Sequence, residues 1–422
     1  MAETAEHAPH AGLDVNFVRA QFPAFDHTET GKWAFFENAG GAYAARPVIE
    51  KLHHFMVAAK VQPYGPSGPS QDTGDAMDLS HRRFEAAINA PAGTVMFGPS
   101  TSINTYVLSQ ALRAMLRPGD EVIVTNQDHE ANAGVWNRLS EGNSGIVVRE
   151  WQVDAESGRL TLEDFDALLS ERTKWVFVTH CSNLAGEIHD IATLTRRAHA
   201  IGAKIAVDGV SYAPHQLPDV AALGVDVYYF SLYKTFGPHQ GLLYATRDVL
   251  DAVPNQGHYF NAGYPDKKLM PAGPQHGEIA CASGVIDYFD ALDVHHFGPN
   301  DDPTHQRIAR LGDLMAEHET TQANRVLQLL QTKGARIIGP KTAEPHRRAA
   351  TIAFKSERVS NSAIADHLRA AHIACGVSDF YAVRLIEALG MDADDGVVRV
   401  SMVHYNSAAD VDRLMNALDE VL

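Results

Sequence analysis

The sequence predicts an α/β protein, with a large domain whose mainly parallel sheet is covered by helices on both faces and a smaller α+β domain. Apolar runs of strand length alternate with helical segments from residue 94 to 246, and this order builds parallel sheets. From about residue 301 one long helical segment precedes short strands and helices. The chain has 422 residues, which is enough for two domains.

The expected domain boundaries follow from these changes in pattern. We expect the large domain over residues 31–300 and the small domain over residues 301–422. Residues 1–14 lack an apolar core and predict a disordered tail. Residues 15–30 are a short amphipathic start, which we expect to pack with the small domain.

Short apolar runs predict the strands, and longer segments with helical periodicity predict the helices. In the large domain we expect strands at 94–97, 121–125, 174–179, 203–208, 225–230 and 241–245, helices at 47–59, 75–88, 103–116, 191–201 and 279–292, and a glycine- and proline-rich loop at 64–70. In the small domain we expect helices at 305–332, 362–371 and 408–421 and strands at 336–338, 350–354 and 397–403.

Composition limits the possible partners and the compartment. The net charge is −17, which argues against nucleic acid and anionic membranes as partners, and no apolar run is long enough to span a membrane. Cys181, Cys281 and Cys375 are too widely spaced for a disulfide framework or a CxxC metal site. We therefore expect no metal and a reducing, cytoplasmic location.

One lysine stands alone at the end of a predicted strand. Lys234 follows the apolar run 225–230, and no other charged residue lies between Tyr228 and Ala245. Desolvation among apolar neighbours lowers the pKa of a lysine and makes its amine a nucleophile toward carbonyls. A lysine that carries a Schiff base to pyridoxal phosphate requires this setting, although a single lysine taken alone more often marks an ordinary surface loop.

A carboxylate ends the preceding predicted strand. Asp208 closes the apolar run 203–208, and an acid there faces the edge at which parallel sheets bind ligands. Pyridoxal phosphate needs such an acid to keep its pyridine nitrogen protonated, so that the ring can take up electrons from the substrate α-carbon. The interval between Asp208 and Lys234 has room for a helix and a strand.

Residues 207–241 resemble the class V aminotransferase family of fold-type I pyridoxal-phosphate enzymes. The resemblance is strongest to its cysteine desulfurase-like subfamily, whose Tyr-Lys-x-Phe-Gly-Pro-His pattern stands at residues 233–239. It implies pyridoxal 5'-phosphate as cofactor, Lys234 and Asp208 as catalytic residues, a small amino acid as substrate and a homodimer. The loop 261–273, which has no obvious partner within one subunit, agrees with a dimer.

A candidate phosphate site follows the strand 94–97. Ser100 and Thr101 lie in a hydroxyl-rich turn before the helix 103–116, and a helix N-terminus favours an anion through its free N–H groups and dipole. The same hydroxyls cap many ordinary helices. The resemblance implies that Ser100 and Thr101 bind the cofactor phosphate.

Further cofactor contacts are implied by the resemblance alone. His129 would act with the catalytic pair by stacking on the pyridine ring, and Asn183 would bind the phenolic oxygen. Ser231 and Tyr233 would offer hydroxyls to the phosphate, although many desulfurases have histidine at the position of Tyr233. Ser211 stands where many of them have glutamine, so its contact with the cofactor departs from the family pattern.

Two residues are expected to bind substrate. Arg399 alternates with Val398 and Val400 in a predicted strand, and its planar guanidinium suits a carboxylate. Its Arg-x-Ser-x-x-x-Tyr-Asn run resembles the substrate-carboxylate segment of the family. The Phe-x-Asn-Ala-Gly-Gly run at residues 36–41 also matches, which implies that Asn38 lies near the same carboxylate.

The sequence constrains the type of reaction less tightly than the identity of the cofactor. In desulfurases a cysteine lies in the loop that corresponds to residues 378–384, and this loop has no cysteine. We therefore expect cysteine desulfurase-like C–S lyase or elimination chemistry through an external aldimine, without a loop cysteine. The alternatives are an aminotransferase or epimerase, a persulfide-forming desulfurase that uses Cys375, and a catalytically silent relative that binds the cofactor for regulation.

Overall fold

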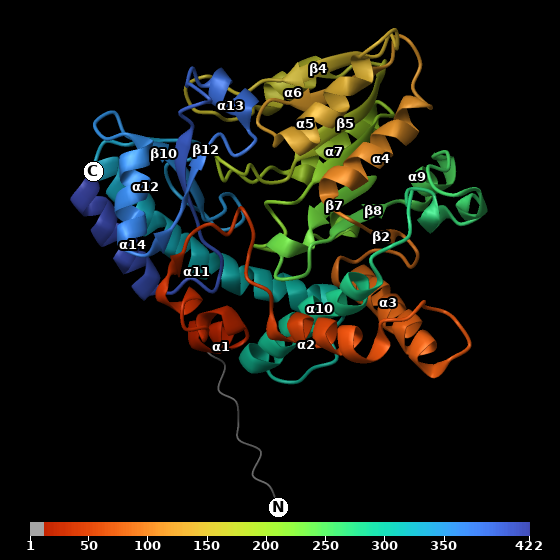
Figure 1. The fold of residues 1–422 in the computed structure, drawn as a ribbon. Helices are drawn as coiled ribbons and strands as arrows, with labels where there is room; N and C mark the ends of the chain where they lie inside the picture. Colours follow the sequence, from red (N-terminus) through yellow and green to blue (C-terminus); the bar gives the residue numbers. More distant parts are fainter. Residues whose placement is uncertain (1–11) are drawn as a thin grey trace, which may run out of the picture.

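A computed structural model describes residues 12–422 of the chain, so most of the predicted tail lies outside the described residues. Its centre is a seven-stranded sheet with the strand order β2-β8-β7-β6-β5-β3-β4 (Figure 1). The strands are β2 (Val95–Gly98), β3 (Glu121–Thr125), β4 (Val147–Trp151), β5 (Thr173–Thr179), β6 (Lys204–Asp208), β7 (Val227–Ser231) and β8 (Gly241–Ala245). Strand β8 pairs antiparallel with both β2 and β7, and the other pairings in this sheet are parallel, which confirms the mainly parallel sheet.

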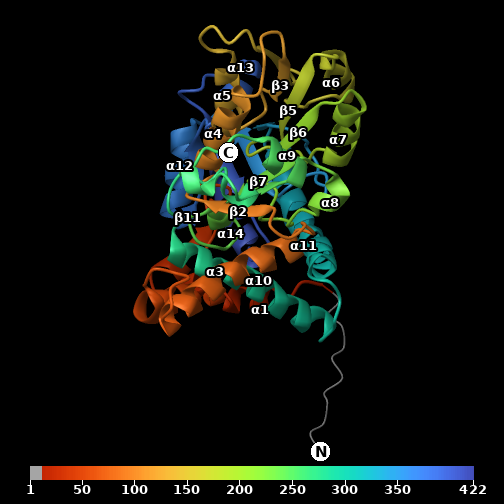
Figure 2. The same ribbon diagram turned by 90° about the vertical axis from the view of Figure 1, so that its right-hand side faces the viewer.

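Helices cover both faces of this sheet because successive strand residues point to opposite sides. On one face Tyr228 and Phe230 of β7 pack with residues of α3 and α10, and on the other Tyr229 packs with α4, α5 and α9. Figure 2 shows α3 and α10 running side by side beneath the sheet. The helices are α3 (Gly68–Ala87), α4 (Thr101–Arg113), α5 (Glu130–Asn137), α6 (Leu162–Leu168), α7 (Ile191–Ala200), α8 (Val220–Leu223), α9 (Arg247–Ala252) and α10 (His276–Phe297).

The C-terminal part forms a second, antiparallel sheet with the strand order β12-β13-β10-β9. Its strands are β9 (Arg336–Ile337), β10 (Thr351–Lys355), β12 (Gly376–Ser378) and β13 (Val397–Ser401), and its helices are α11 (Thr304–Thr332), α12 (Asn361–Ala370), α13 (Val383–Ala388) and α14 (Ala408–Val421). An apolar core of its own joins α11, α12 and α14 to β10 and β13. The smaller α+β unit is thereby confirmed, while the boundary at residue 300 stays a prediction.

The N-terminal segment joins the two parts. It contains α1 (Val15–Ala20), α2 (Arg46–His54) and a π-helical turn (Phe55–Ala59), and β1 (Ala34–Phe35) pairs in parallel with β11 (Ile373–Ala374). Arg19 forms a 2.8 Å ion pair with Asp410 at the start of α14, and the Phe22 ring contacts those of Tyr288 and Tyr405. Because β1 is held in this way, the turn that follows it lies beside β13.

Among residues 12–422, no helix combines the length and apolarity needed to cross a lipid bilayer. Within the same range, no group of three or more His, Cys, Asp or Glu side chains could hold a metal ion.

Candidate active site

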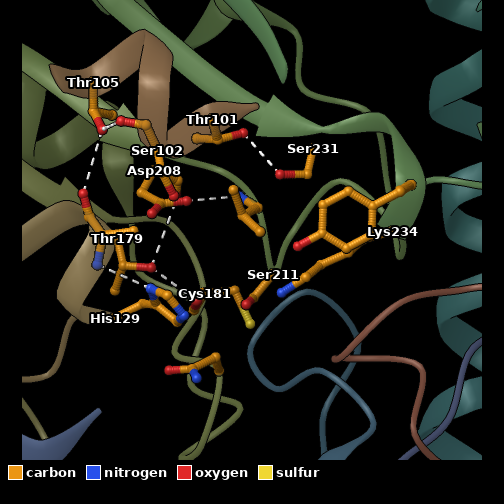
Figure 3. A pocket seen from close by; sticks show the side chains of 14 residues that line it. Thr101, Ser102, Thr105, His129, Thr179, Cys181, Asp208, Ser211, Ser231 and Lys234 are labelled. Carbon is orange, nitrogen blue, oxygen red and sulfur yellow. Dashed lines mark hydrogen bonds between the residues drawn. The ribbon is translucent and has the colours of Figure 1, made fainter. Parts of the chain in front are cut away.

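A pocket opens where the carboxyl ends of β5, β6 and β7 meet the first residues of α4 and α5 (Figure 3). Sheets of this kind bind ligands at this edge. The structure brings eight of the nine predicted catalytic and cofactor-binding residues into the lining of this pocket: Thr101, His129, Asn183, Asp208, Ser211, Ser231, Tyr233 and Lys234. Their roles stay predictions, but their convergence from distant parts of the chain does not depend on those roles.

Lys234 ends a single 3-10 turn (Leu232–Lys234) that directly follows β7. This turn keeps the side chain inside the protein, where only 7% of the residue is exposed, and Figure 3 shows it directed into the pocket. Burial, together with the positive charge of Arg399, lowers the pKa of Lys234 to about 8. Part of the amine is therefore unprotonated near neutral pH, as a nucleophile toward a carbonyl requires.

Asp208 is the last residue of β6, and its carboxylate accepts a 2.8 Å hydrogen bond from the backbone N–H of Val210. Burial raises the pKa of Asp208 to about 6. Burial and the negative charge of Asp208 raise the pKa of the adjacent Asp128 well above its usual range. Burial thus disfavours the charged form of Asp128, whereas the hydrogen bond from Val210 and the charge of Lys234 favour the charged form of Asp208.

The start of α4 is the candidate anion cradle. The Thr101 and Ser231 hydroxyl oxygens lie 2.7 Å apart in the pocket wall. Strand β8 approaches this helix start closely, since a Cβ on Gly241 would lie 2.4 Å from the backbone nitrogen of Thr101. Ser100 takes the capping role instead: its hydroxyl accepts a 3.2 Å hydrogen bond from the N–H of Ile103, and it does not line the pocket.

His129 caps the next helix, α5. Its Nδ1 accepts a hydrogen bond from the backbone N–H of Ala131 at 3.0 Å, which fixes the ring at the pocket wall. Burial, with the charges of Lys234 and Arg399, lowers the pKa of His129 to about 4. A neutral imidazole therefore faces the pocket, as a ring that stacks on an aromatic cofactor would.

Arg399 is buried on β13 and held on several sides. Its Nη2 donates a 2.8 Å hydrogen bond to Oε1 of Glu37, and its Nη1 donates to the carbonyl of Asn183 at 3.3 Å. Its Cζ lies 3.8 Å from the centroid of the Phe380 ring. The Nε of Arg399 is buried without a partner among the described residues. Arg399 does not line the pocket described above, but it contacts Asn183, which does.

The structure gives Asn38 a structural role. Its side-chain nitrogen donates to the carbonyl of Ser401 at 2.8 Å, and its side-chain oxygen accepts a short hydrogen bond from the Tyr405 hydroxyl. Asn38 is buried beside β13 and does not line the pocket. Its contact with substrate stays a prediction, whereas the neighbouring Glu37, which we did not single out in the sequence, contacts Arg399 directly.

The loop between β12 and α13 is pinned over the pocket. The Phe380 carbonyl accepts a 2.9 Å hydrogen bond from Asn183 Nδ2, and the Tyr381 carbonyl accepts one from the N–H of Glu130 at 2.6 Å. Phe380 and Tyr381 both have left-handed backbone conformations, with φ of 51° and 57°, which bulky residues rarely adopt. Strain of this kind persists where surrounding contacts enforce it and is typical of functional sites.

None of the three cysteines has the environment of a reactive thiolate. Burial raises the pKa of Cys181, which lines the pocket, to about 12. Burial likewise raises the pKa of Cys281 in α10 to about 12 and that of Cys375, beside β12, to about 11.

The residues of the pocket fit pyridoxal phosphate. Lys234 would hold the carbonyl carbon of the cofactor, Asp208 would accept a hydrogen bond from the ring nitrogen, and the start of α4 would bind the phosphate. Two observations support this assignment. The hydroxyls of Thr101 and Ser231 meet in the pocket wall at the start of α4, and Oδ1 of Asn183 is buried without a partner among the described residues.

Comparison with known proteins gives the same result. A family model described as aminotransferase class-V matches residues 34–261 and 309–414. The aminotransferase-like protein FGM3 of Gibberella zeae is 32% identical, over 98% of this chain and 99% of its own. The cysteine desulfurase-like protein ustD of Aspergillus flavus is 31% identical, over 97% and 91% of the two chains.

Solved structures agree on the fold. The cysteine desulfurase CsdA from Escherichia coli aligns with a TM-score of 0.79 at 24% identity, over 97% of this chain and 98% of its own. The cysteine desulfurase from Thermococcus onnurineus aligns with a TM-score of 0.82 at 22% identity, over 96% and 97%. This protein therefore belongs to the class V aminotransferase family of pyridoxal-phosphate-dependent enzymes, and it resembles the cysteine desulfurase-like members of that family.

Proposed function

We propose that this enzyme acts on a free amino acid by C–S lyase or elimination chemistry and that no protein thiol takes part. The observation that carries the proposal is the buried Lys234 amine, which shares a pocket with the buried acid Asp208 while the loop above that pocket has no cysteine. Pyridoxal phosphate, when bound, supplies an electron sink for the bonds at the substrate α-carbon. The intact pair of Lys234 and Asp208 argues against a silent cofactor-binding protein.

The residues would divide the chemistry as follows. Arg399 would hold the α-carboxylate through its open Nε, which orients the bonds at the α-carbon. The Lys234 amine would take up and return the α-proton, because its pKa of about 8 allows both protonation states near neutral pH. Ionised Asp208 would place a negative charge at the opposite end of the site, and the neutral His129 ring would cover one face of the cofactor ring.

Three alternative activities make different products. An aminotransferase or an epimerase would use the same lysine and acid and differs from a lyase in its product. A persulfide-forming desulfurase would need Cys375 as a nucleophile. The raised pKa and partial burial of Cys375 argue against that role.

We also propose a homodimer, as the family relation suggests. A face of the molecule exposes apolar and aromatic side chains on two segments: Met56, Val57, Tyr64, Tyr259 and Phe260. Tyr259 is 89% exposed. Two neighbouring grooves share Gln62 and His276, and their linings include Met56, Tyr64 and Phe260, so these three side chains border one surface suited to a second copy. Sedimentation of a fully active monomer at micromolar concentration would contradict this.

The test of the proposed chemistry is a screen of single amino acids against the purified, cofactor-loaded enzyme. Changes in cofactor absorbance report binding, and assays for pyruvate, sulfide, keto acids and inverted amino acid identify the product. We expect ammonia and a keto acid, with sulfide when the substrate contains sulfur, and no product from Lys234→Ala. Amino-group transfer to a keto acid without elimination would establish the aminotransferase instead.

A further inference from the structure

An acidic side chain occupies one edge of the candidate carboxylate-binding arginine. Oε1 of Glu37 accepts a 2.8 Å hydrogen bond from Nη2 of Arg399, whose side chain is only 4% exposed. Oε2 of Glu37 and Nε of Arg399 are both buried, and neither has a hydrogen-bond partner among the described residues. The pair is therefore incomplete, because one acceptor and one donor remain to be satisfied.

The fold makes room for this acid. A Cβ on Gly376 would lie 2.5 Å from Oε2 of Glu37, and a Cβ on Gly40 would lie 3.1 Å from Oε1. The backbone at Glu37 is fixed as well, since residue 37 forms an isolated bridge with Ser401, two residues after Arg399. The placement of a carboxylate beside Arg399 thus follows from two glycines and from the pairing with β13.

Glu37 changes what the arginine can bind. The carboxylate holds Nη2 and offsets the guanidinium charge, so Nε is the donor left for a ligand, beside a negative group. The pair lies behind the pocket wall, where Arg399 contacts the pocket residue Asn183. Because charges interact strongly at short range in a partly desolvated site, a second carboxylate on the ligand would be repelled by Glu37. The field of Glu37 extends to Lys234, where it opposes that of Arg399, so both charges act on the pocket itself.

We infer that Glu37 is a charge-selectivity residue, which restricts the substrate to amino acids with one carboxylate and a neutral or basic side chain. This inference rests on the proposed function, because it assumes an amino-acid substrate. It assigns Glu37 an electrostatic role at the substrate and no part in the chemistry.

The test uses glutamine and glutamate, which have the same shape and differ in side-chain charge. Each is titrated into cofactor-loaded enzyme, and the dissociation constant is read from the absorbance change within milliseconds of mixing, before turnover. We expect wild-type enzyme to bind glutamine at least tenfold more tightly than glutamate. Glu37→Gln should reduce this ratio to threefold or less, mainly by tightening the binding of glutamate.

Two variants make the result specific. Glu37→Asp keeps the negative charge and should retain most of the discrimination. Glu29→Gln is the matched control, because Glu29 lies in the same N-terminal segment but is exposed and paired with Lys32. It should leave the ratio unchanged.

Equal binding of glutamate and glutamine by wild-type enzyme would overturn the inference, even if Glu37→Gln failed to fold. An unchanged ratio in a folded Glu37→Gln protein would also overturn it, while the proposed function would stand because amino acids still bind. If no amino acid of any charge altered the cofactor spectrum, the proposed function itself would fail.

Discussion

The guanidinium of Arg399 lies over the ring of Phe380, with 3.8 Å between its Cζ and the ring centroid. Together with the hydrogen bond to Glu37, this contact fixes both the plane and the rotation of the guanidinium. Phe380 lies in the loop where related desulfurases are expected to carry a cysteine. In this chain we therefore assign the loop to positioning the arginine.

Arg399→Lys should lower kcat/KM for the substrate, because lysine keeps the charge but lacks both the Nε–H donor left for the carboxylate and the planar group that contacts Glu37 and Asn183. The loss of one charge-assisted contact corresponds to roughly 1.5–3 kcal/mol, or about 10- to 100-fold. The absorption band of the cofactor should not change. Arg384→Lys is the control, because Arg384 is partly exposed and pairs with Glu130 at 3.3 Å. Full kcat/KM in Arg399→Lys would remove Arg399 from the site.

Asp208→Asn should stabilise the cofactor-free protein at pH 7.5. The pKa of Asp208 is raised from 3.8 to about 6 by burial, so its ionised form favours the unfolded chain. The neutral form of Asp208 adds roughly 3 kcal/mol to the free energy of unfolding. This contribution is present below about pH 4 and is lost as the pH rises toward 6. The variant should therefore unfold at a higher urea midpoint than wild type at pH 7.5, and the gain should shrink at pH 4.

The same variant should bind pyridoxal phosphate more weakly, because a neutral amide cannot stabilise a protonated ring nitrogen. Urea unfolding and cofactor titration together check both effects. An Asp208→Asn protein with wild-type cofactor affinity, or with an urea midpoint no higher than that of wild type at pH 7.5, would contradict the assignment of Asp208.

Gly241→Ala should damage the phosphate cradle at the start of α4. The added Cβ would lie 2.4 Å from both the Thr101 nitrogen and the Ser100 carbonyl carbon, and these backbone atoms have little freedom to move. We expect a loss of stability of about 1–3 kcal/mol and cofactor affinity lower by roughly tenfold or more. Gly263→Ala is the matched control, since a Cβ there meets nothing within 4 Å. Equal cofactor affinity in the two variants would show that the cradle does not bind the phosphate.

Much of the fold could be predicted because its strands are buried on both faces. The predicted strands at 203–208 and 225–230 correspond to β6 and β7 within two residues at each end. The edge strand β4 was missed, since its residues are half exposed and mix charged with apolar side chains. Helix α3 begins inside the predicted loop 64–70, because Pro69 suits the first turn of a helix.

The candidate site was predictable where a residue follows a strand directly. Asp208 and Lys234 were found this way, and the structure places both in one pocket. The Glu37 contact was not predictable, because Glu37 and Arg399 are more than 300 residues apart and meet only through the bridge between residue 37 and β13. The sign of this contact in the sequence was an acidic residue directly before Asn38. That residue cannot be interpreted before its partner, Arg399, is known.

The central claim is that turnover depends on Lys234 and on none of the cysteines. The turnover of Cys375→Ser tests this claim most directly. Cofactor-loaded Cys375→Ser and Lys234→Ala proteins would be assayed beside wild type, on the amino acid that gives the largest product yield in the screen. We predict that Cys375→Ser retains kcat within about threefold of wild type, since a positioned nucleophile would account for far more, and that Lys234→Ala makes no product. Loss of turnover in a folded, cofactor-binding Cys375→Ser enzyme would contradict the account and establish a persulfide-forming desulfurase.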